Sequence, residues 1–89
     1  MTLRHVLPKA VEIYNRYRGS EAVCRIVSGG DDHAILRFEG HFCLTCGVFD
    51  WIEDIVYILE DLGVEAYISR VEYHNEEGYV LAEIRLKHR

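Results

Sequence analysis

The chain has 89 residues, of which 49% are hydrophobic and 28% charged, a balance typical of a globular domain and not of a disordered or fibrous chain. A net charge of −5 weighs against a general nucleic-acid binder, and no apolar run approaches the roughly 18–20 residues of a membrane span. A chain of this length forms a single domain, here residues 1–89, with a thin core, so that a crosslink, a metal or a partner chain would add stability.

The first expected element is a short amphipathic helix that begins near Pro8 and ends at Gly19. Proline suits the first turn of a helix, and glycine suits the position just after its end. The expected buried face carries Val6, Leu7, Ala10, Ile13, Tyr14 and Tyr17. The solvent-facing side carries Lys9, Glu12, Asn15 and Arg16.

Alternating apolar residues predict four strands in two hairpins, and a second helix lies between the hairpins. The first hairpin joins residues 22–28 and 33–39 through the turn sequence GGDD, and the second joins 64–74 and 78–88. Residues 48–63 have helical spacing, and one broad apolar face carries Trp51, Ile52, Ile55, Ile58, Leu59 and Leu62. Gly63 is expected to end this helix.

The element order αββαββ predicts an α+β fold, in which a four-stranded antiparallel sheet carries both helices on one face. The halves 1–44 and 45–89 correspond at an offset of 44 residues, which fits an internal αββ repeat within the single domain. Moving the last strand to the front gives βαββαβ, so we expect a permuted ferredoxin-like arrangement with the second and fourth strands in the middle. Many unrelated functions use this fold, so the function must be argued from residues.

The stretch GHFCLTCGVFDWIED, residues 40–54, contains the most chemically suggestive spacing in the chain. The C-x-x-C spacing of Cys43 and Cys46 lets both sulfur atoms bind one tetrahedral ion, and His41 would be a third ligand. A structural zinc needs four ligands, and Cys24 is the first candidate for the missing one because the expected sheet brings this loop near it. Zinc is therefore kept as an alternative, and no other cofactor is expected.

A disulfide explains the same cysteines with fewer requirements. The chain has eight Arg, two Asn and no Gln, a depletion of thermolabile amides that suggests a thermophilic source, where intracellular disulfides are common. The first expected pair is Cys43–Cys46, and Cys24 joined to one of them is the second choice. Redox exchange at Cys43 and Cys46 has less support, because the helix N-terminus that would favour a thiolate also carries three acidic residues.

No other pattern indicates catalysis, and we expect the chain not to be an enzyme. It contains no nucleophilic triad, no P-loop and no dinucleotide-binding glycine motif, which leaves thiol exchange as the one activity that the residues suggest. The acidic residues of 50–61 are typical of a solvated helix face. The N-terminal sequence MTLRHVLPKAVEIY lacks the continuous apolar segment of a signal peptide, so a cytoplasmic location is expected.

Alternation along the strands predicts a helix-facing side and an open side of the sheet. The expected helix-facing residues are Ala22, Cys24, Ile26, Ala34, Leu36, Phe38, Val64, Ala66, Ile68, Val80, Ala82, Ile84 and Leu86. The expected open side carries Val23, Arg25, Val27, Ile35, Arg37, Tyr67, Val71, Tyr73, Tyr79, Leu81 and Arg85, with Glu39, Glu65 and Glu83. Such a side is too apolar to be simply left in water, so we expect it to bind a partner.

Two kinds of partner compete for the open side. Three tyrosines and the arginines resemble the stacking surfaces on which four-stranded sheets bind single-stranded nucleic acid, but the glutamates and the net charge oppose that interpretation. A second copy of the chain fits better, since an apolar centre with arginine and glutamate around it can pair with itself about a two-fold axis. We therefore expect a homodimerising structural or interaction module stabilised by a disulfide, with no small-molecule substrate and no membrane partner.

Overall fold

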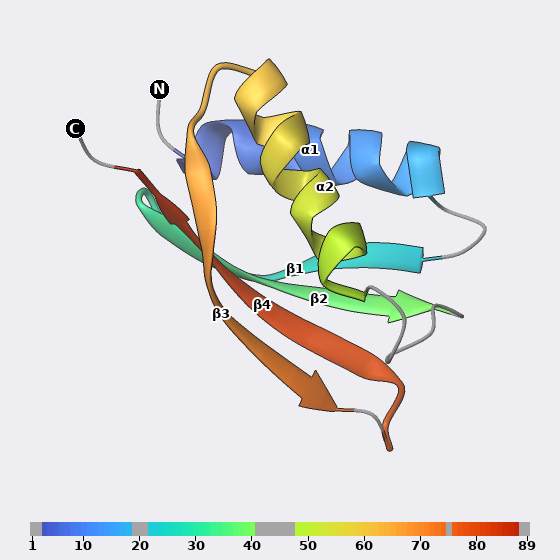
Figure 1. Cartoon of the computed structure of the whole chain (residues 1–89). Coiled ribbons are helices and arrows are strands. Elements are labelled where there is room, and N and C mark those ends of the chain that lie inside the picture. The colour runs from blue at the N-terminus through green and yellow to red at the C-terminus, as the bar shows by residue number, and fades with distance from the viewer. Residues whose placement is uncertain (1–2, 19–21, 41–47, 75, 88–89) are drawn as a thin grey trace.

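The computed structural model describes residues 3–18, 22–40, 48–74 and 76–87 as two layers, a sheet and a pair of helices (Figure 1). The elements are α1 (Leu3–Arg18), β1 (Ala22–Gly29), β2 (His33–Gly40), α2 (Val48–Asp61), β3 (Ala66–His74) and β4 (Tyr79–Leu86). The strands lie in the order β1-β2-β4-β3, and each neighbouring pair is antiparallel. Both helices cover the same face of the sheet (Figure 1). The expected α+β fold is confirmed, with β2 and β4 in the middle as the permuted ferredoxin-like layout requires.

Helix α1 begins at Leu3, five residues before the proline that was expected to start it. The fully or largely buried stripe consists of Leu3, Val6, Leu7, Ala10 and Tyr14, which follows helical spacing. Burying one large apolar side chain contributes about 1.5–3 kcal/mol, so several of them outweigh the roughly 3 kcal/mol that Pro8 costs inside a helix. The Leu3 N–H also donates to the Asp31 carbonyl (3.0 Å), which satisfies one of the free amides at the helix start.

Helix α2 packs its apolar face as the sequence predicts. Ile52, Ile55 and Leu59 are fully buried, and they lie in one core with the helix-facing side chains of the sheet. The helix ends at Asp61, and in the turn that follows Gly63 has a φ of 92°, which few other residues adopt. The Val64 N–H donates to the Leu59 carbonyl (2.9 Å), and the Gly63 N–H donates to the Glu60 carbonyl (2.9 Å). These two bonds form the Schellman motif that turns the chain into β3.

A β-bulge in β3 reverses the faces of the residues that follow it. The bulge lies between Ile68, which pairs with Ile84, and Arg70, which pairs with Glu83. Beyond it, Val71 pairs with Ala82 and Tyr73 pairs with Val80, and both of these partners are buried under the helices. Val71 and Tyr73 therefore lie on the helix side, not on the open side where simple alternation placed them. Their places on the open side are taken by Arg70, Glu72 and His74.

A second bulge interrupts β1, the other edge strand, between Ile26 and Ser28. Ile26 pairs with Leu36 and so belongs to the helix side as expected, but it is 40% exposed at the edge of the sheet. Val27 is the inserted residue and has no partner in the register. Bulges of this kind are common on edge strands, because there the chain has only one neighbour to stay in register with.

Candidate functional site

The open face of the sheet is the surface that neither helix covers. Cross-strand pairing arranges its side chains in four rows: Tyr67–Arg85–His33, Arg70–Glu83–Ile35–Ser28, Glu72–Leu81–Arg37–Arg25 and His74–Tyr79–Glu39–Val23. Ile35 and Leu81 occupy the two central strands in the two middle rows, and both are half-buried. Charged side chains surround this apolar centre on both sides.

The charges of the open face almost cancel. Its arginines are Arg25, Arg37, Arg70 and Arg85, and its glutamates are Glu39, Glu72 and Glu83. Three ion pairs join residues two apart on one strand: Arg37 Nε to Glu39 Oε1 (2.6 Å), Arg70 Nη2 to Glu72 Oε2 (3.4 Å) and Arg85 Nε to Glu83 Oε1 (2.9 Å). Solvent-exposed pairs contribute only about 0–1 kcal/mol each, so their main effect is to hold the side chains in place. The chain's excess of negative charge therefore lies elsewhere.

The ring of Tyr79 is covered on both of its faces. From the β2 side, the Arg37 guanidinium carbon lies 3.8 Å from the ring centroid. From the β3 side, the His74 ring stacks on it with centroids 4.5 Å apart and planes 14° apart. His74 Nε2 lies 3.4 Å from Glu72 Oε1, which extends the cluster along β3. A nucleotide base would have to displace one of these side chains before it could stack on Tyr79.

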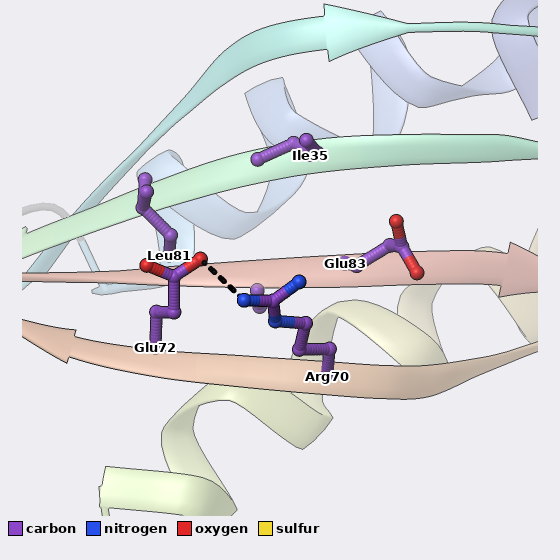
Figure 2. Close-up of a pocket in the computed structure, with 6 residues that line it drawn as sticks. Ile35, Arg70, Glu72, Leu81 and Glu83 are labelled. Atoms are coloured by element: carbon purple, nitrogen blue, oxygen red, sulfur yellow. Dashed lines mark ion pairs between the residues drawn. The ribbon is translucent and has the colours of Figure 1, made fainter.

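A small hollow of about 70 Å³ lies at the centre of the open face. Ile35 and Leu81 contribute its apolar part, and Arg70, Glu72 and Glu83 surround them (Figure 2). Sites for small molecules and cofactors usually measure about 300–1,000 Å³ and enclose most of the ligand. This hollow is therefore too small to enclose a cofactor or a substrate of ordinary size.

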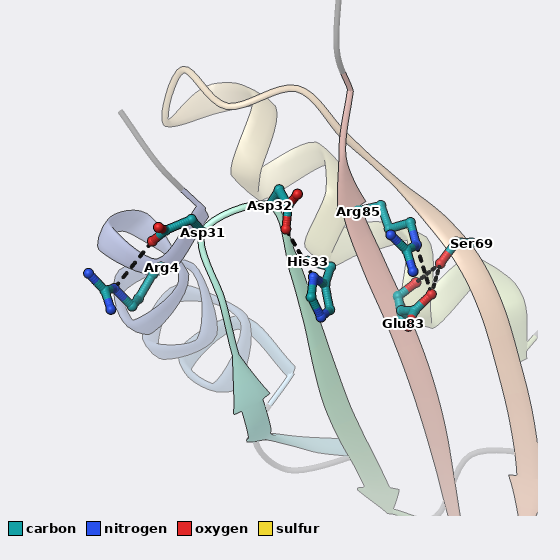
Figure 3. Close-up of polar contacts among 7 residues, drawn as sticks. All are labelled: Arg4, Asp31, Asp32, His33, Ser69, Glu83 and Arg85. Carbon is teal, nitrogen blue, oxygen red and sulfur yellow. Dashed lines mark hydrogen bonds and ion pairs between the residues drawn. The ribbon is translucent and has the colours of Figure 1, made fainter.

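Ser69, the bulge residue of β3, fixes the carboxylate of Glu83 (Figure 3). Its Oγ donates to Glu83 Oε1 (2.7 Å) and lies 3.2 Å from the Glu83 carbonyl oxygen. Arg85 Nε donates to the same Oε1 (2.9 Å). The hydrogen bond from Ser69, followed by that from Arg85, holds the pKa of Glu83 below its usual value, because both stabilise the ionised carboxylate.

The open face contains most of the residues that the sequence assigned to it. Val23, Arg25, Ile35, Arg37, Tyr67, Tyr79, Leu81 and Arg85 lie there. Val71 and Tyr73 lie on the helix side instead, and Val27 is the inserted residue of the β1 bulge. The residues that sequence reasoning missed are Arg70, Glu72 and His74. The sequence does carry a sign of the β3 bulge. Two polar residues, Ser69 and Arg70, stand together between the apolar residues Ile68 and Val71, which breaks the period-two pattern of a regular strand.

Of the residues proposed for a disulfide or a zinc site, only Cys24 lies within the described ranges. Cys24 is 1% exposed on the helix side, and burial raises the pKa of its thiol from 9.0 to about 12. A thiol that keeps its proton is a poor nucleophile and a poor metal ligand. His41, Cys43 and Cys46 lie outside the described residues. Within 3–18, 22–40, 48–74 and 76–87, no group of three or more potential ligands comes together to hold a metal ion.

Comparison with known proteins gives no match: no family model fits the chain, and no curated protein or solved structure is significantly similar to it. In the part of the chain that the structure describes, neither helix is both long and apolar enough to cross a membrane.

Proposed function

We propose that this chain is a homodimerising interaction module whose open face packs against the open face of a second copy. The observation that carries the proposal is the position of Ile35 and Leu81, half-buried at the middle of the uncovered sheet within a nearly neutral frame of arginine and glutamate. In a two-fold interface each patch meets its own copy, so the patch must complement itself. A face with both signs of charge in similar number and an apolar centre meets that condition.

The arrangement of the charges supports a protein partner in a second way. Three of the four arginines of the open face are already paired within their own strand, which favours one arrangement of these side chains before association. A surface that is ordered in advance loses less side-chain entropy on binding. Burial of about 600–800 Å² per subunit is typical of a modest stable interface, and a four-stranded face is large enough to supply it.

Single-stranded nucleic acid has less support as the partner. Tyr73 lies on the helix side, both faces of the Tyr79 ring are covered, and the net charge of the chain is −5. That leaves Tyr67, at 42% exposure, as the aromatic ring of the open face with room for a base. The disulfide at Cys43 and Cys46 and the cytoplasmic location belong to the same proposal on sequence grounds alone.

The test is sedimentation equilibrium of the protein and of Leu81→Arg at tens of micromolar. We expect a dimer for the parent and a monomer for the variant, because an added guanidinium would be buried at the centre of the interface without a partner. Tyr57→Arg, which places the same charge on α2 in the other layer, is the matched control and should remain dimeric. A monomeric parent, or a Leu81→Arg variant that dimerises like the parent, would refute the proposal. Tight and strongly salt-dependent binding of a mixed oligonucleotide would favour nucleic acid instead.

A further inference from the structure

The two edges of the sheet differ in how their backbone groups are satisfied. The edge strands are β1 and β3 (Figure 1). At β1, the side chain of Asn15 on α1 bonds both the N–H and the carbonyl of Cys24, at 2.7 and 3.0 Å. At β3, only β4 among the described parts of the chain pairs with the backbone of residues 68–73. An unpaired edge of this kind is a template for a further strand.

The register shows which backbone groups of β3 point away from the sheet. The Lys87 N–H donates to the Glu65 carbonyl (2.9 Å), and the Leu86 N–H donates to the Asp32 carbonyl just before β2 (2.7 Å). Odd-numbered residues of β4 therefore face β3, and even-numbered ones face β2. The β3 residues opposite even-numbered partners turn their N–H and C=O outward: Ala66, Ile68, Val71 and Tyr73. Ala66 is buried, so the accessible edge consists of the other three, which we call the β3 edge.

The β3 edge also carries apolar surface on the helix side. Ile68 and Val71 are half-buried, and Tyr73 is 49% exposed. Beside Ile68, between α2 and β3, lies a hollow of about 280 Å³ lined by Glu53, Val56, Ala66, Tyr67, Ile68 and Lys87. The more exposed tyrosines lie on helices, whose backbone groups are already paired: Tyr57 (58%) and Tyr17 (78%), which was expected to face the core. The β3 edge thus combines free backbone groups with apolar side chains.

We propose that the β3 edge binds an extended segment of a partner protein, which adds to the sheet as a further strand. The backbone of the segment would bond to the outward N–H and C=O groups of Val71 and Tyr73. Its apolar side chains on the helix side would cover Val71 and Tyr73 and reach the hollow beside Val56. The bulge at Ser69 interrupts regular pairing, which limits the added strand to a short segment.

A second copy of the chain is less suited to this edge. In an antiparallel pair of β3 strands the two-fold axis is perpendicular to the sheet, so both α2 helices would lie side by side on one face. Helix α2 carries five acidic residues and no basic one, and like charges would oppose this arrangement. In the hollow, Glu53 and Lys87 have opposite signs and form no ion pair with a described side chain. A short segment with one residue of each sign would complement both. The proposal goes beyond the dimer, because pairing of the open faces leaves the β3 edge free.

The experiment uses the full chain and a synthetic peptide of alternating valine and threonine with one lysine, one glutamate and blocked ends. Because the peptide is neutral, the net charge of −5 does not attract it. When the peptide is added, the amides of Ile68, Val71 and Tyr73 should exchange with solvent at least about tenfold more slowly. The amide of Glu72 faces β4 and should be unchanged, which makes it the internal control.

Two matched pairs test whether the backbone itself is recognised. Of two peptides, N-methylated on every valine or on every threonine, one should bind at least about tenfold more weakly than the other, since only one set of N–H groups faces β3. In the protein, Tyr73→Pro removes an outward N–H that β4 does not use, whereas Tyr73→Ala retains it. Tyr73→Pro should bind the parent peptide at least about tenfold more weakly than Tyr73→Ala.

Several outcomes would overturn the proposal. Unchanged exchange at all three edge amides would mean that no strand is added, and equal binding within both matched pairs would mean that the backbone takes no part. Edge amides already protected in the free protein would show that the edge is covered, by a second copy if the protection falls on dilution. The Leu81→Arg variant separates the two proposals: protection of its edge amides by the peptide supports the β3 edge even where the parent proves monomeric and the proposed dimer fails.

Discussion

The side-chain amide of Asn15 on α1 forms two hydrogen bonds with the backbone of Cys24 on β1. Asn15 Nδ2 donates to the Cys24 carbonyl (3.0 Å), and the Cys24 N–H donates to Asn15 Oδ1 (2.7 Å). Because β1 is an edge strand, these backbone groups have no further strand to pair with. The amide takes the place of that strand, which ties α1 to the sheet and shields the edge from pairing with another chain.

Replacing Asn15 by alanine should lower the free energy of unfolding by about 1–3 kcal/mol. The change removes two hydrogen bonds and leaves a poorly solvated N–H and C=O without partners. Glu12→Ala is the matched control on the same helix: it breaks exposed ion pairs and should cost less than about 0.5 kcal/mol. Urea unfolding measures both, and equal small losses would show that the amide contributes nothing specific.

Truncation of the α2 core face should be more severe. Ile55 is fully buried in the core shared by the helices and the sheet, so Ile55→Ala should cost about 2–4 kcal/mol through lost burial and an unfilled cavity. The exposed Tyr57 on the same helix is the control, and Tyr57→Ala should stay within about 0.5 kcal/mol of the parent. An Ile55→Ala loss below about 0.5 kcal/mol would contradict the role of this face in holding α2.

The buried thiol of Cys24 should make stability depend on alkaline pH. The unfolded chain loses this proton near pH 9, whereas the folded chain retains it to about pH 12, so the unfolded state binds fewer protons above pH 9. The stabilising contribution of the Cys24 thiol to the free energy of unfolding is complete below pH 9. It declines above pH 9, at up to about 1.4 kcal/mol per pH unit. Cys24→Ala should lack this component of the slope between pH 9 and 10.5. Parallel stability profiles for the two proteins would contradict the raised pKa.

The cysteine pair makes a prediction about the protein as isolated without reductant. Fewer than three reactive thiols per chain should be found after denaturation, and no stoichiometric zinc, if Cys43 and Cys46 form the expected disulfide. Cys24 would then be the thiol that remains, and it should react only when the chain unfolds because it is buried. Thiol titration and metal analysis decide between the alternatives, since three free thiols with one zinc per chain would favour the metal site.

The order of the elements was predictable because it depends on periodicity that each segment carries by itself. Ile52, Ile55 and Leu59 repeat at helical spacing, and Ala34, Leu36 and Phe38 alternate, whatever the rest of the chain does. The pairing within each hairpin followed from the short connections, and the place of the second and fourth strands in the middle followed from the permuted ferredoxin-like layout. The open face was largely predictable for the same reason, because alternation assigns faces wherever a strand is regular.

The sequence-based expectations differed from the structure where the conformation of one residue depends on a contact with a distant part of the chain. A bulge at Ser69 inserts one residue, and that single step moves Val71 and Tyr73 to the other face. The helical wheel placed Asn15 among solvent-facing residues, since it does not show that the edge of β1 passes beside that position. Pro8 was read as a helix start on local preference, whereas the burial of Leu3 extends the helix past it.

The bulge also makes a prediction about Glu83, whose carboxylate accepts from Ser69 and from Arg85. Ser69→Ala should raise the pKa of Glu83 toward its ordinary value, because the larger of the two stabilising hydrogen bonds is lost. A depressed pKa in the folded state stabilises the fold above the unfolded pKa, and that contribution disappears as the pH falls through the folded pKa. Ser69→Ala should therefore lose less stability than the parent on acidification through this range.

Carbon-detected titration of the Glu83 carboxyl group measures the shift in its pKa directly. Ser28→Ala, on the other bulged strand, is the control that should leave this pKa unchanged. An unaltered or lower pKa in Ser69→Ala would show that Arg85 alone sets the ionisation of Glu83.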